Sequence, residues 1–166
     1  MNARALACCA FTGAFLAMVL SISYSVAAED ITGKPVIVDG DSIKIAGERI
    51  RLHGIDAPEK RQACHRDEEE YACGTEATVA LSALISGQRV ACRSVDRDRY
   101  GRTVAKCYLG EIDINEQMVR QGWAVAYRKY SMDYVAAEDA ARAEKSGLWA
   151  GQFMLPWEWR RAKRAK

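Results

Sequence analysis

Four ionisable side chains fall within one nine-residue segment, 51–59. They are a guanidinium, an imidazole and two carboxylates, carried by Arg51, His53, Asp56 and Glu59. Pro58 disfavours helical backbone at the residue before it, so the second half of the segment should be extended or turned. If these groups converge at the end of a strand, they suit a metal ligand, a general base and a phosphate clamp.

Two residues outside this segment could complete the site. Asp41 follows a predicted strand and an Asp-Gly turn, and it lies close to Asp56 if the first three strands form a meander. The two carboxylates would then face each other as hard oxygen ligands, which suit calcium. Arg102, in a charged loop, is a second candidate phosphate ligand. Taken singly, Asp41 reads as part of a hairpin turn, and Arg51 and Arg102 read as surface ion pairs.

Short β-prone segments and amphipathic helices make up the rest of the pattern. We expect strands at residues 34–38, 43–45, 50–54, 89–95 and 103–109. We expect helices at residues 75–85 (capped by Thr75), 114–121 and 134–145, and an extended aromatic segment at 123–130. Five strands with one helix between the third and the fourth are the pattern of a Greek-key barrel. We therefore predict an α+β fold, a five-stranded OB-fold β-barrel with about three α-helices.

The N-terminal 28 residues have the composition of a secretory signal peptide. Arg4 gives a positive start, residues 5–20 are apolar and uncharged, and small residues precede Glu29. Cleavage near Ala28 would produce a secreted or periplasmic protein with no stable membrane association. An uncleaved membrane anchor is the alternative, but the apolar segment is short for a membrane span.

The remaining chain is long enough for one domain with a single core and too short for two. We divide the sequence into a signal peptide at residues 1–28, one domain at 29–159 and a basic C-terminal tail at 160–166. Without the tail the domain is net acidic, so it lacks the global basic field of many nucleic-acid-binding domains. The tail reads as a solvated, frayed terminus, with electrostatic attraction to polyanions as the alternative.

Four cysteines follow the predicted signal peptide: Cys64, Cys73, Cys92 and Cys107. An even number in an oxidising compartment predicts disulfides, and four cysteines allow three pairings. We favour Cys64 with Cys73 and Cys92 with Cys107, because each pair is short-range and flanks one local loop or hairpin. Residues 60–74 are polar and predict an exposed loop, which a bond between Cys64 and Cys73 would staple. A zinc site is the alternative, but the cysteine spacing and the single nearby imidazole argue against it.

Residues 34–150 resemble the staphylococcal (thermonuclease-type) nuclease family. The segments that carry the resemblance are residues 38–42, 50–52, 55–59, 98–102, 115–122 and 148–149. Each segment is short, but their joint order and spacing are specific. The resemblance implies an OB-fold nuclease domain at residues 29–159 that cleaves DNA and RNA with Ca²⁺ as cofactor.

The resemblance also implies which residues bind the metal ion. Asp41 and Asp56 match the calcium carboxylates, and Ala57 matches the residue whose main-chain carbonyl binds the ion. The family usually has threonine where Ser42 and Ala57 stand. A carbonyl ligand survives the change at position 57, whereas a hydroxyl contact there is lost.

Three further matches imply catalytic roles. Arg51 and Arg102 match the two phosphate-binding arginines, and Glu59 matches the proposed general base. A phosphodiester is anionic, so its hydrolysis requires the charge neutralisation that a cation and two guanidiniums supply. Glu59 would accept a proton from water, and release of the 5′ oxygen would leave a 3′-phosphate. His53, on the same predicted strand face as Arg51, is the alternative base.

Tyr127 and Tyr130 fall near the family's nucleotide-stacking tyrosines, although their spacing differs from that of the family. A stacking platform accepts any base, since every base has a π-face. The sequence thus predicts an exported calcium-dependent nuclease that acts on DNA and RNA as a monomer. The alternative is a non-catalytic OB-fold module that binds nucleic acid, because OB barrels host many functions.

Overall fold

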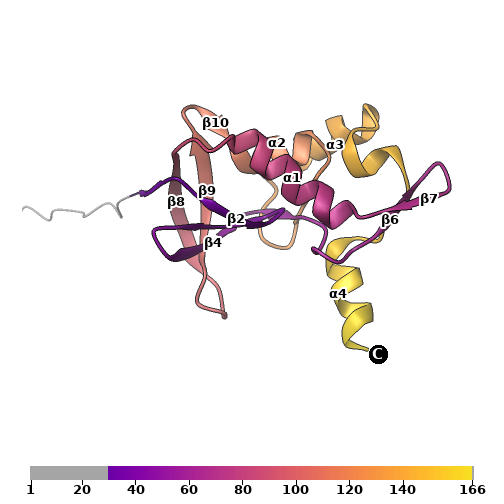
Figure 1. Ribbon diagram of the computed structural model, residues 1–166, viewed down its shortest axis with the longest axis horizontal. Helices are drawn as coiled ribbons and strands as arrows, with labels where there is room; N and C mark the ends of the chain where they lie inside the picture. The colour runs from indigo at the N-terminus through magenta and orange to yellow at the C-terminus, as the bar shows by residue number, and fades with distance from the viewer. Residues whose placement is uncertain (1–29, 166) are drawn as a thin grey trace, which may run out of the picture.

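The computed structural model describes residues 30–165. The predicted signal peptide at residues 1–28 therefore lies outside the described residues. The chain forms a mixed α+β fold with one main sheet, and Figure 1 shows α1, α2 and α3 on one side of that sheet and α4 on the other.

Seven strands of the described chain form the main sheet: β1 (Ile31–Gly33), β2 (Val36–Asp39), β3 (Ser42–Ile45), β4 (Glu48–Leu52), β8 (Val90–Arg97), β9 (Thr103–Leu109) and β10 (Ile112–Asp113). The strand order is β1-β8-β9-β4-β3-β2, and β10 pairs with β9. All neighbours are antiparallel except β4 and β9, which are parallel. Only Lys34 and Pro35 separate β1 from β2 in sequence, yet these strands stand at opposite ends of the path. Within residues 30–165, no direct strand pairing closes the path into a barrel.

The five predicted strands are all present, as β2, β3, β4, β8 and β9, with ends that differ from the prediction by at most two residues. Side-chain alternation explains this agreement, because successive residues of a strand point to opposite faces. In β3, for example, Ile43 and Ile45 are buried while Lys44 is exposed.

The described residues contain four α-helices and one 3₁₀ helix, where about three helices were predicted: α1 (Cys73–Ile85), α2 (Ile114–Arg120), α3 (Val135–Ala143), η1 (Gly147–Ala150) and α4 (Pro156–Arg164). The prediction that Thr75 caps the first helix was wrong. Helix α1 begins at Cys73, and the residue before it, Ala72, makes no side-chain cap bond. Its backbone carbonyl accepts the amide of Thr75 instead.

The predicted exposed loop at residues 60–74 contains a small hairpin. Strands β6 (Cys64–Arg66) and β7 (Glu69–Tyr71) pair antiparallel. Asp67 and Glu68 form the turn with positive φ values of 49° and 69°, the backbone that two-residue hairpin turns require. The acidic composition of this segment concealed the strands, since such residues are more typical of solvated loops.

Two predictions about the second half of the chain were also wrong. In the segment 123–130, only β11 (Val125–Ala126) is a strand, and it pairs with β5 (Ile55–Asp56). The predicted basic tail is helical at residues 160–164, because α4 crosses the predicted boundary at residue 159. Pro at the first helical position and basic residues in the last turn both stabilise this helix.

The core lies between the main sheet and the helices α1 and α2. Its largest fully buried apolar side chains come from both layers: Ile43, Ile45, Ile50, Leu52, Ile55, Leu81, Ile85, Ile114 and Met118. Burying one such side chain contributes about 1.5–3 kcal/mol. This core fixes the ends of β3, β4 and β5, from which the polar residues of the candidate site project.

Both predicted disulfides are confirmed. Cys64 bonds to Cys73, and Cys92 bonds to Cys107 between directly opposed positions of β8 and β9. Disulfides persist in oxidising compartments, so the two bonds favour an extracytoplasmic location. Within residues 30–165, no helix has the length and apolar character needed to cross a membrane.

Asn115 joins three elements in the interior. Its side chain is fully buried, accepts a hydrogen bond from the Cys107 amide in β9, and donates to the carbonyls of His53 and Ala105. The residue therefore ties α2 to β9 and to the segment that leaves β4, directly before the acidic residues of the candidate site.

Asn115→Ala should lower the free energy of unfolding by about 3 kcal/mol, because a buried polar group without a partner costs about 1–3 kcal/mol. Equilibrium unfolding in urea measures the change. Gln117→Ala, on the same helix, is the control and should stay within about 0.5 kcal/mol of the wild type. Equal losses in the two variants would contradict this role for Asn115.

Candidate active site

Two carboxylates meet at one guanidinium. Arg51 Nη1 donates to Asp41 Oδ1 at 2.5 Å, and Arg51 Nη2 donates to Asp56 Oδ1 at 2.5 Å. Because both nitrogens belong to the same planar group, the two acids lie side by side. Asp41 and Asp56 are 3% and 0% exposed, so the charges are screened little by solvent.

The backbone sets this geometry at the ends of three strands. Arg51 in β4 stands opposite Ser42 in β3, and the carbonyl of Asp41 accepts the amide of Leu52. Asp41 Oδ2 accepts the amide of Ala57 at 2.7 Å, directly after β5. The meander that the sequence predicted thus brings the first turn to the end of the third strand.

A close approach at Gly40 seats the Asp41 turn against the first helix. A Cβ atom at position 40 would lie 2.8 Å from the Cβ atoms of both Ala57 and Ala77. Real Cβ atoms do not approach so closely, so glycine is required where the turn packs on α1. The small side chains of Ala57 and Ala77 serve the same packing.

Burial dominates the electrostatics of Asp41. It raises the pKa of Asp41 to about 7, against the opposing effects of the Arg51 cation and the Ala57 amide. Arg51 shows the reverse balance: burial acts to lower its pKa, but Asp41 and Asp56 together raise it. The guanidinium is therefore charged, and its charge opposes the effect of burial on the pKa of Asp41.

Arg102 reaches the same group of residues through one hydroxyl. Its Nη1 lies 3.5 Å from Ser42 Oγ, which itself donates to Asp41 Oδ1 at 3.2 Å. Asp98 fixes the Arg102 side chain by accepting from its Nε at 2.7 Å and from its backbone amide at 2.9 Å. The side chain is 21% exposed, so its cation is held at the rim of the site.

Glu59 joins the acids through an arginine that the sequence analysis did not assign to the site. Arg160 Nη1 donates to Glu59 Oε1 at 2.7 Å and to Asp56 Oδ1 at 3.0 Å. Its Nη2 donates to Asp56 Oδ2 at 2.8 Å. Arg160 thus makes a two-pronged contact with Asp56 and links it to Glu59.

The backbone of Glu59 is held from two sides. A Cβ atom at Gly74 would lie 1.8 Å from the Glu59 carbonyl oxygen, so only glycine fits where α1 begins. The buried Gln62 accepts the Glu59 amide at 3.2 Å and donates to the Met154 carbonyl at 2.6 Å. Gln62 therefore ties the Glu59 segment to the chain that leads into α4.

Arg160 could not be found from local sequence patterns. A proline followed by a basic last turn predicts that α4 is a helix. Its partner Asp56 stands 104 residues earlier in the chain, and no spacing rule links the two. Gln62 was missed for a related reason, since a single glutamine in a polar segment carries no local signal.

The two predicted tyrosines lie together next to α4. The rings of Tyr127 and Tyr130 make an edge contact with centroids 4.9 Å apart. Tyr127 also stacks on Trp157, with centroids 5.1 Å apart and an angle of 4° between the planes. Tyr130 is 62% exposed.

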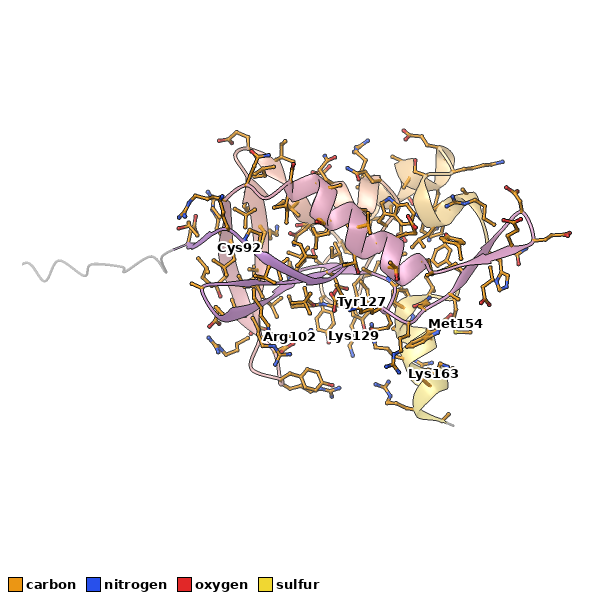
Figure 2. The ribbon with its side chains drawn as sticks, viewed as in Figure 1. Cys92, Arg102, Tyr127, Lys129, Met154 and Lys163 are labelled. Atoms are coloured by element: carbon orange, nitrogen blue, oxygen red, sulfur yellow. A yellow bond between two sulfur atoms is a disulfide. The ribbon has the colours of Figure 1, made fainter. Side chains whose placement is uncertain are left out.

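Figure 2 shows Arg102, Lys129 and Lys163 on the side of the sheet away from α1.

His53 has a different environment from the one predicted. Burial lowers its pKa, and the Lys106 ammonium adds to this effect. Asp133 and Asp96 act in the opposite direction. The role of His53 as the alternative base stays a prediction.

The carboxylates of Asp41 and Asp56 are hard oxygen donors. Within residues 30–165, no cluster of three or more histidine, cysteine, aspartate or glutamate side chains has metal-binding geometry. The two adjacent carboxylates are nevertheless the oxygen ligands that calcium accepts, with carbonyls and waters completing the shell. The chemistry of these two carboxylates therefore suits calcium.

Arg51→Met should lower the free energy of unfolding by about 3 kcal/mol at pH 8, because it leaves the buried Asp41 without its cation and Asp56 with Arg160 alone. Removing the cation also raises the pKa of Asp41 further above its unfolded value. The folded variant then takes up a proton more readily than the unfolded chain, so its deficit should shrink between pH 8 and pH 5. Urea unfolding at both pH values measures this difference. The exposed Arg49→Met is the control, and a pH-independent deficit in Arg51→Met would refute the assignment.

Comparison with known proteins agrees with this geometry. The family model described as Staphylococcal nuclease homologue matches residues 49–151. Succinoglycan biosynthesis protein ExoI of Rhizobium meliloti (strain 1021) is 39% identical over 145 residues, which cover 84% of this chain and 75% of that protein. An uncharacterized endonuclease of Escherichia coli O157:H7 is 36% identical over 159 residues, which cover 90% of this chain and 98% of that protein. The probable staphylococcal-like nuclease CAN1 of Oryza sativa subsp. japonica is 36% identical over 128 residues, which cover 75% of this chain and 36% of that protein. The chain belongs to the staphylococcal nuclease family.

Proposed function

We propose that this protein is an exported, calcium-dependent nuclease that hydrolyses the phosphodiester bonds of DNA and RNA and leaves 3′-phosphate ends. The observation that carries the proposal is the contact of Arg51 with both Asp41 and Asp56, next to the rim cation of Arg102. Family membership supports the reaction class, since the family consists of nucleases, and a relative that covers most of the chain is described as an endonuclease. An OB-like barrel is the fold that the family implies.

Calcium is the cofactor that the family typically requires. Oxygens of Asp41 and Asp56 would hold it, with the main-chain carbonyl of Ala57 as a third protein ligand. When bound, the ion supplies Lewis-acid polarisation of a phosphoryl oxygen. The Asp56 oxygens now accept hydrogen bonds from Arg51 and Arg160, so the ion and these arginines compete for the same carboxylate.

The protein's own residues account for substrate binding and proton transfer. The planar guanidinium groups of Arg51 and Arg102 can each donate two parallel hydrogen bonds to two oxygens of a phosphate. Each guanidinium binds the phosphate more strongly in a site that contains little water. Glu59 is 34% exposed, so it can meet a water molecule at the edge of the buried acids. It would accept the proton of the attacking water, and the leaving 5′ oxygen would take a proton from solvent.

Export and a monomeric state complete the proposal. The two disulfides support an oxidising compartment, so the protein would be secreted or periplasmic. Residues 1–28 would direct its export and would be removed by cleavage near Ala28. The proposed domain extends from residue 29 through α4, because Arg160 belongs to the site.

Glu59→Gln should lower turnover on single-stranded DNA at least about a hundredfold, since general-base catalysis contributes roughly 10²–10⁴ in rate. The steady-state rate with calcium present measures the loss. Glu158→Gln, an exposed acid in the first turn of α4, is the matched control. Turnover of Glu59→Gln near that of the wild type would remove Glu59 from its role, and binding without cleavage by both proteins would favour a non-catalytic module.

Removal of calcium with a chelator should abolish cleavage, and added calcium should restore it. Hydrolysis of labelled single-stranded DNA is the assay. Undiminished hydrolysis in excess chelator would reject the calcium assignment, whatever the outcome for Glu59.

Arg160→Met should increase the affinity for calcium about tenfold, or about 1.4 kcal/mol. The substitution removes a positive charge and frees Asp56 Oδ2, while Oδ1 still accepts from Arg51. Isothermal titration calorimetry measures the affinity directly, without reference to activity. Arg164→Met, on the same helix but without a contact to Asp56, controls for net charge. Weaker or unchanged calcium binding by Arg160→Met would contradict competition at Asp56.

A further inference from the structure

Two hydrogen bonds join the backbone of Glu59 to one buried residue. The amide of Gln62 donates to the Glu59 carbonyl at 2.7 Å, and Gln62 Oε1 accepts the Glu59 amide at 3.2 Å. The carbonyl of Gln62 in turn accepts the amide of Gly74 at 3.2 Å. Gln62 is 1% exposed, so water does not replace these contacts. The place of Glu59 therefore depends on how Gln62 is held against the first turn of α1.

The Cys64–Cys73 disulfide closes the chain around this contact. Cys64 stands two residues after Gln62, and Cys73 directly precedes Gly74. The disulfide thus joins the same two segments that the hydrogen bond from Gly74 to Gln62 joins. A disulfide keeps its two Cα atoms about 4.4–6.8 Å apart, and here they are 5.6 Å apart. The covalent bond therefore limits how far the two segments can separate.

The hairpin of β6 and β7 is also attached to the chain that leads into α4. His65 and Gln152 exchange two backbone hydrogen bonds, at 2.9 and 2.8 Å. Gln62 Nε2 donates to the Met154 carbonyl at 2.6 Å. A Cβ atom at Gly151 would lie 2.1 Å from the His65 carbonyl oxygen, so the two backbones touch. Freedom gained in the hairpin would reach Gln62 from this side too.

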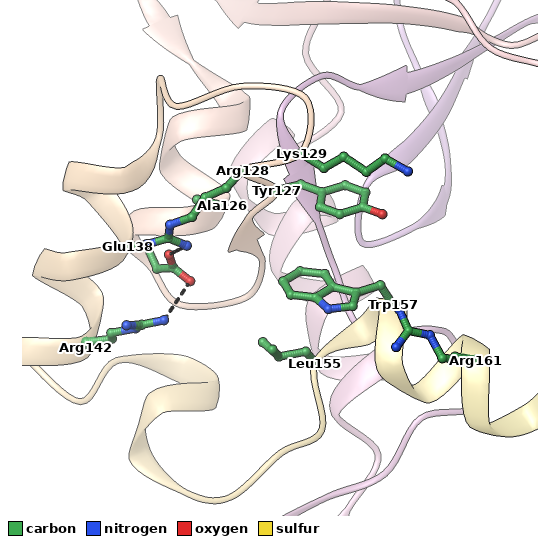
Figure 3. A pocket seen from close by; sticks show the side chains of 9 residues that line it. All are labelled: Ala126, Tyr127, Arg128, Lys129, Glu138, Arg142, Leu155, Trp157 and Arg161. Carbon is green, nitrogen blue, oxygen red and sulfur yellow. Dashed lines mark hydrogen bonds and ion pairs between the residues drawn. The ribbon is translucent and has the colours of Figure 1, made fainter.

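Helix α4 and the two acids have anchors elsewhere. Trp157, in the first turn of α4, stacks on Tyr127, and Figure 3 shows the two rings side by side. Arg51 contacts both acids of the proposed calcium site from β4. Loss of the Cys64–Cys73 bond should therefore displace Glu59 while the two acids keep their places.

We propose that the Cys64–Cys73 disulfide is a positioning element for Glu59 that acts through Gln62, so that the enzyme gains full turnover only after this bond has formed. A chain made in a reducing compartment carries two thiols and a poorly placed base. Nucleic acid in that compartment is then protected from the enzyme until the chain reaches an oxidising one. The inference rests on the proposed role of Glu59 and on the proposed export.

The bond forms by thiol–disulfide exchange with an oxidant disulfide, for example glutathione disulfide. The thiolate of one cysteine attacks the oxidant, forms a mixed disulfide and releases one oxidant thiolate. The thiolate of the other cysteine then attacks the sulfur of the first and releases the second oxidant thiolate. The two cysteines lose two electrons and two protons, which the oxidant gains as two thiols. Cys64 and Cys73 are buried in the fold, so exchange takes place before the chain closes over them.

Cys64→Ala/Cys73→Ala tests the positioning role, with Cys92→Ala/Cys107→Ala as the matched control. Each pair of changes removes one buried disulfide, but the control bond joins β8 to β9. Steady-state hydrolysis of single-stranded DNA with calcium gives kcat and KM. Circular dichroism and thermal unfolding verify that both variants are folded at the temperature of the assay.

Two further measurements do not depend on activity. Hydrogen exchange reports the opening of the Glu59 and Gly74 amides, whose acceptors both belong to Gln62. Isothermal titration calorimetry gives the affinity for calcium. Gln62→Met, with both disulfides intact, removes the side-chain acceptor of the Glu59 amide and retains an unbranched side chain, so it tests the same path if the cysteine variant does not fold.

We expect Cys64→Ala/Cys73→Ala to lower kcat about ten- to a hundredfold, since a misplacement of about 1 Å can cost about a hundredfold in rate. KM and the affinity for calcium should not change. The Glu59 and Gly74 amides should exchange at least about tenfold faster, as expected for local opening. The control pair should keep the wild-type kcat and the wild-type exchange of these two amides. Gln62→Met should also lower kcat without a change in KM.

Refolding tests the dependence on oxidation. The Cys92→Ala/Cys107→Ala protein, which has the Cys64–Cys73 bond as its only native disulfide among the described residues, is reduced, denatured and refolded with or without glutathione disulfide. The wild-type kcat should return only with the oxidant, and alkylation of free thiols should then find neither cysteine.

Equal losses of kcat in the two cysteine pairs would overturn the positioning role, because they would reflect lost stability alone. Unchanged exchange of the Glu59 amide in Cys64→Ala/Cys73→Ala would overturn it as well, and so would full turnover after refolding without oxidant. If the folded wild-type protein fails to cleave DNA, the nuclease function is rejected, and the exchange rates alone decide whether the disulfide fixes the Glu59 segment.

Discussion

The contact of Arg51 with Asp41 and Asp56 is the interaction on which the rest of the structure depends. Two carboxylates buried side by side repel each other, and burial alone raises the pKa of such an acid. A guanidinium between them opposes this repulsion, and its rigid fork sets their separation and orientation. Asp41 comes from the turn before β3, Arg51 from β4 and Asp56 from β5 of the smaller β5–β11 sheet. The β3–β4 register and the β5–β11 pair bring these residues to one point.

The same constraint explains why the surroundings are built from small or buried groups. Gly40 and Gly74 stand where the backbone of the site touches α1, at separations that no Cβ would allow. Asn115 and Gln62 satisfy buried backbone groups next to the acids. These residues position the backbone of the site. In such a fixed and buried environment, electrostatic interactions between charged groups are stronger than they are in water.

Helix α4 gives this family member a feature beyond the segment matched by the family model. Arg160 adds a second guanidinium to Asp56, and the stacked Trp157 and Tyr127 join the helix to the domain. Residues 160–164 of the predicted basic tail are helical, and Arg160 among them contacts both Asp56 and Glu59.

The sequence by itself determined the main strands, both disulfides and the location of most of the candidate site. Alternation in segments such as Ile43–Ile45 predicted the strands, the short separations of the cysteines predicted both disulfides, and the cluster of residues 51–59 predicted where the acids and the arginine would gather. The spacing of residues predicts these features because each involves residues that are close in sequence or that follow one regular period. Only the tertiary structure decided that Arg160 contacts Asp56, that Gln62 holds the Glu59 segment, and that Trp157 stacks on Tyr127. These contacts join residues far apart along the chain, and their geometry depends on how all the intervening elements pack.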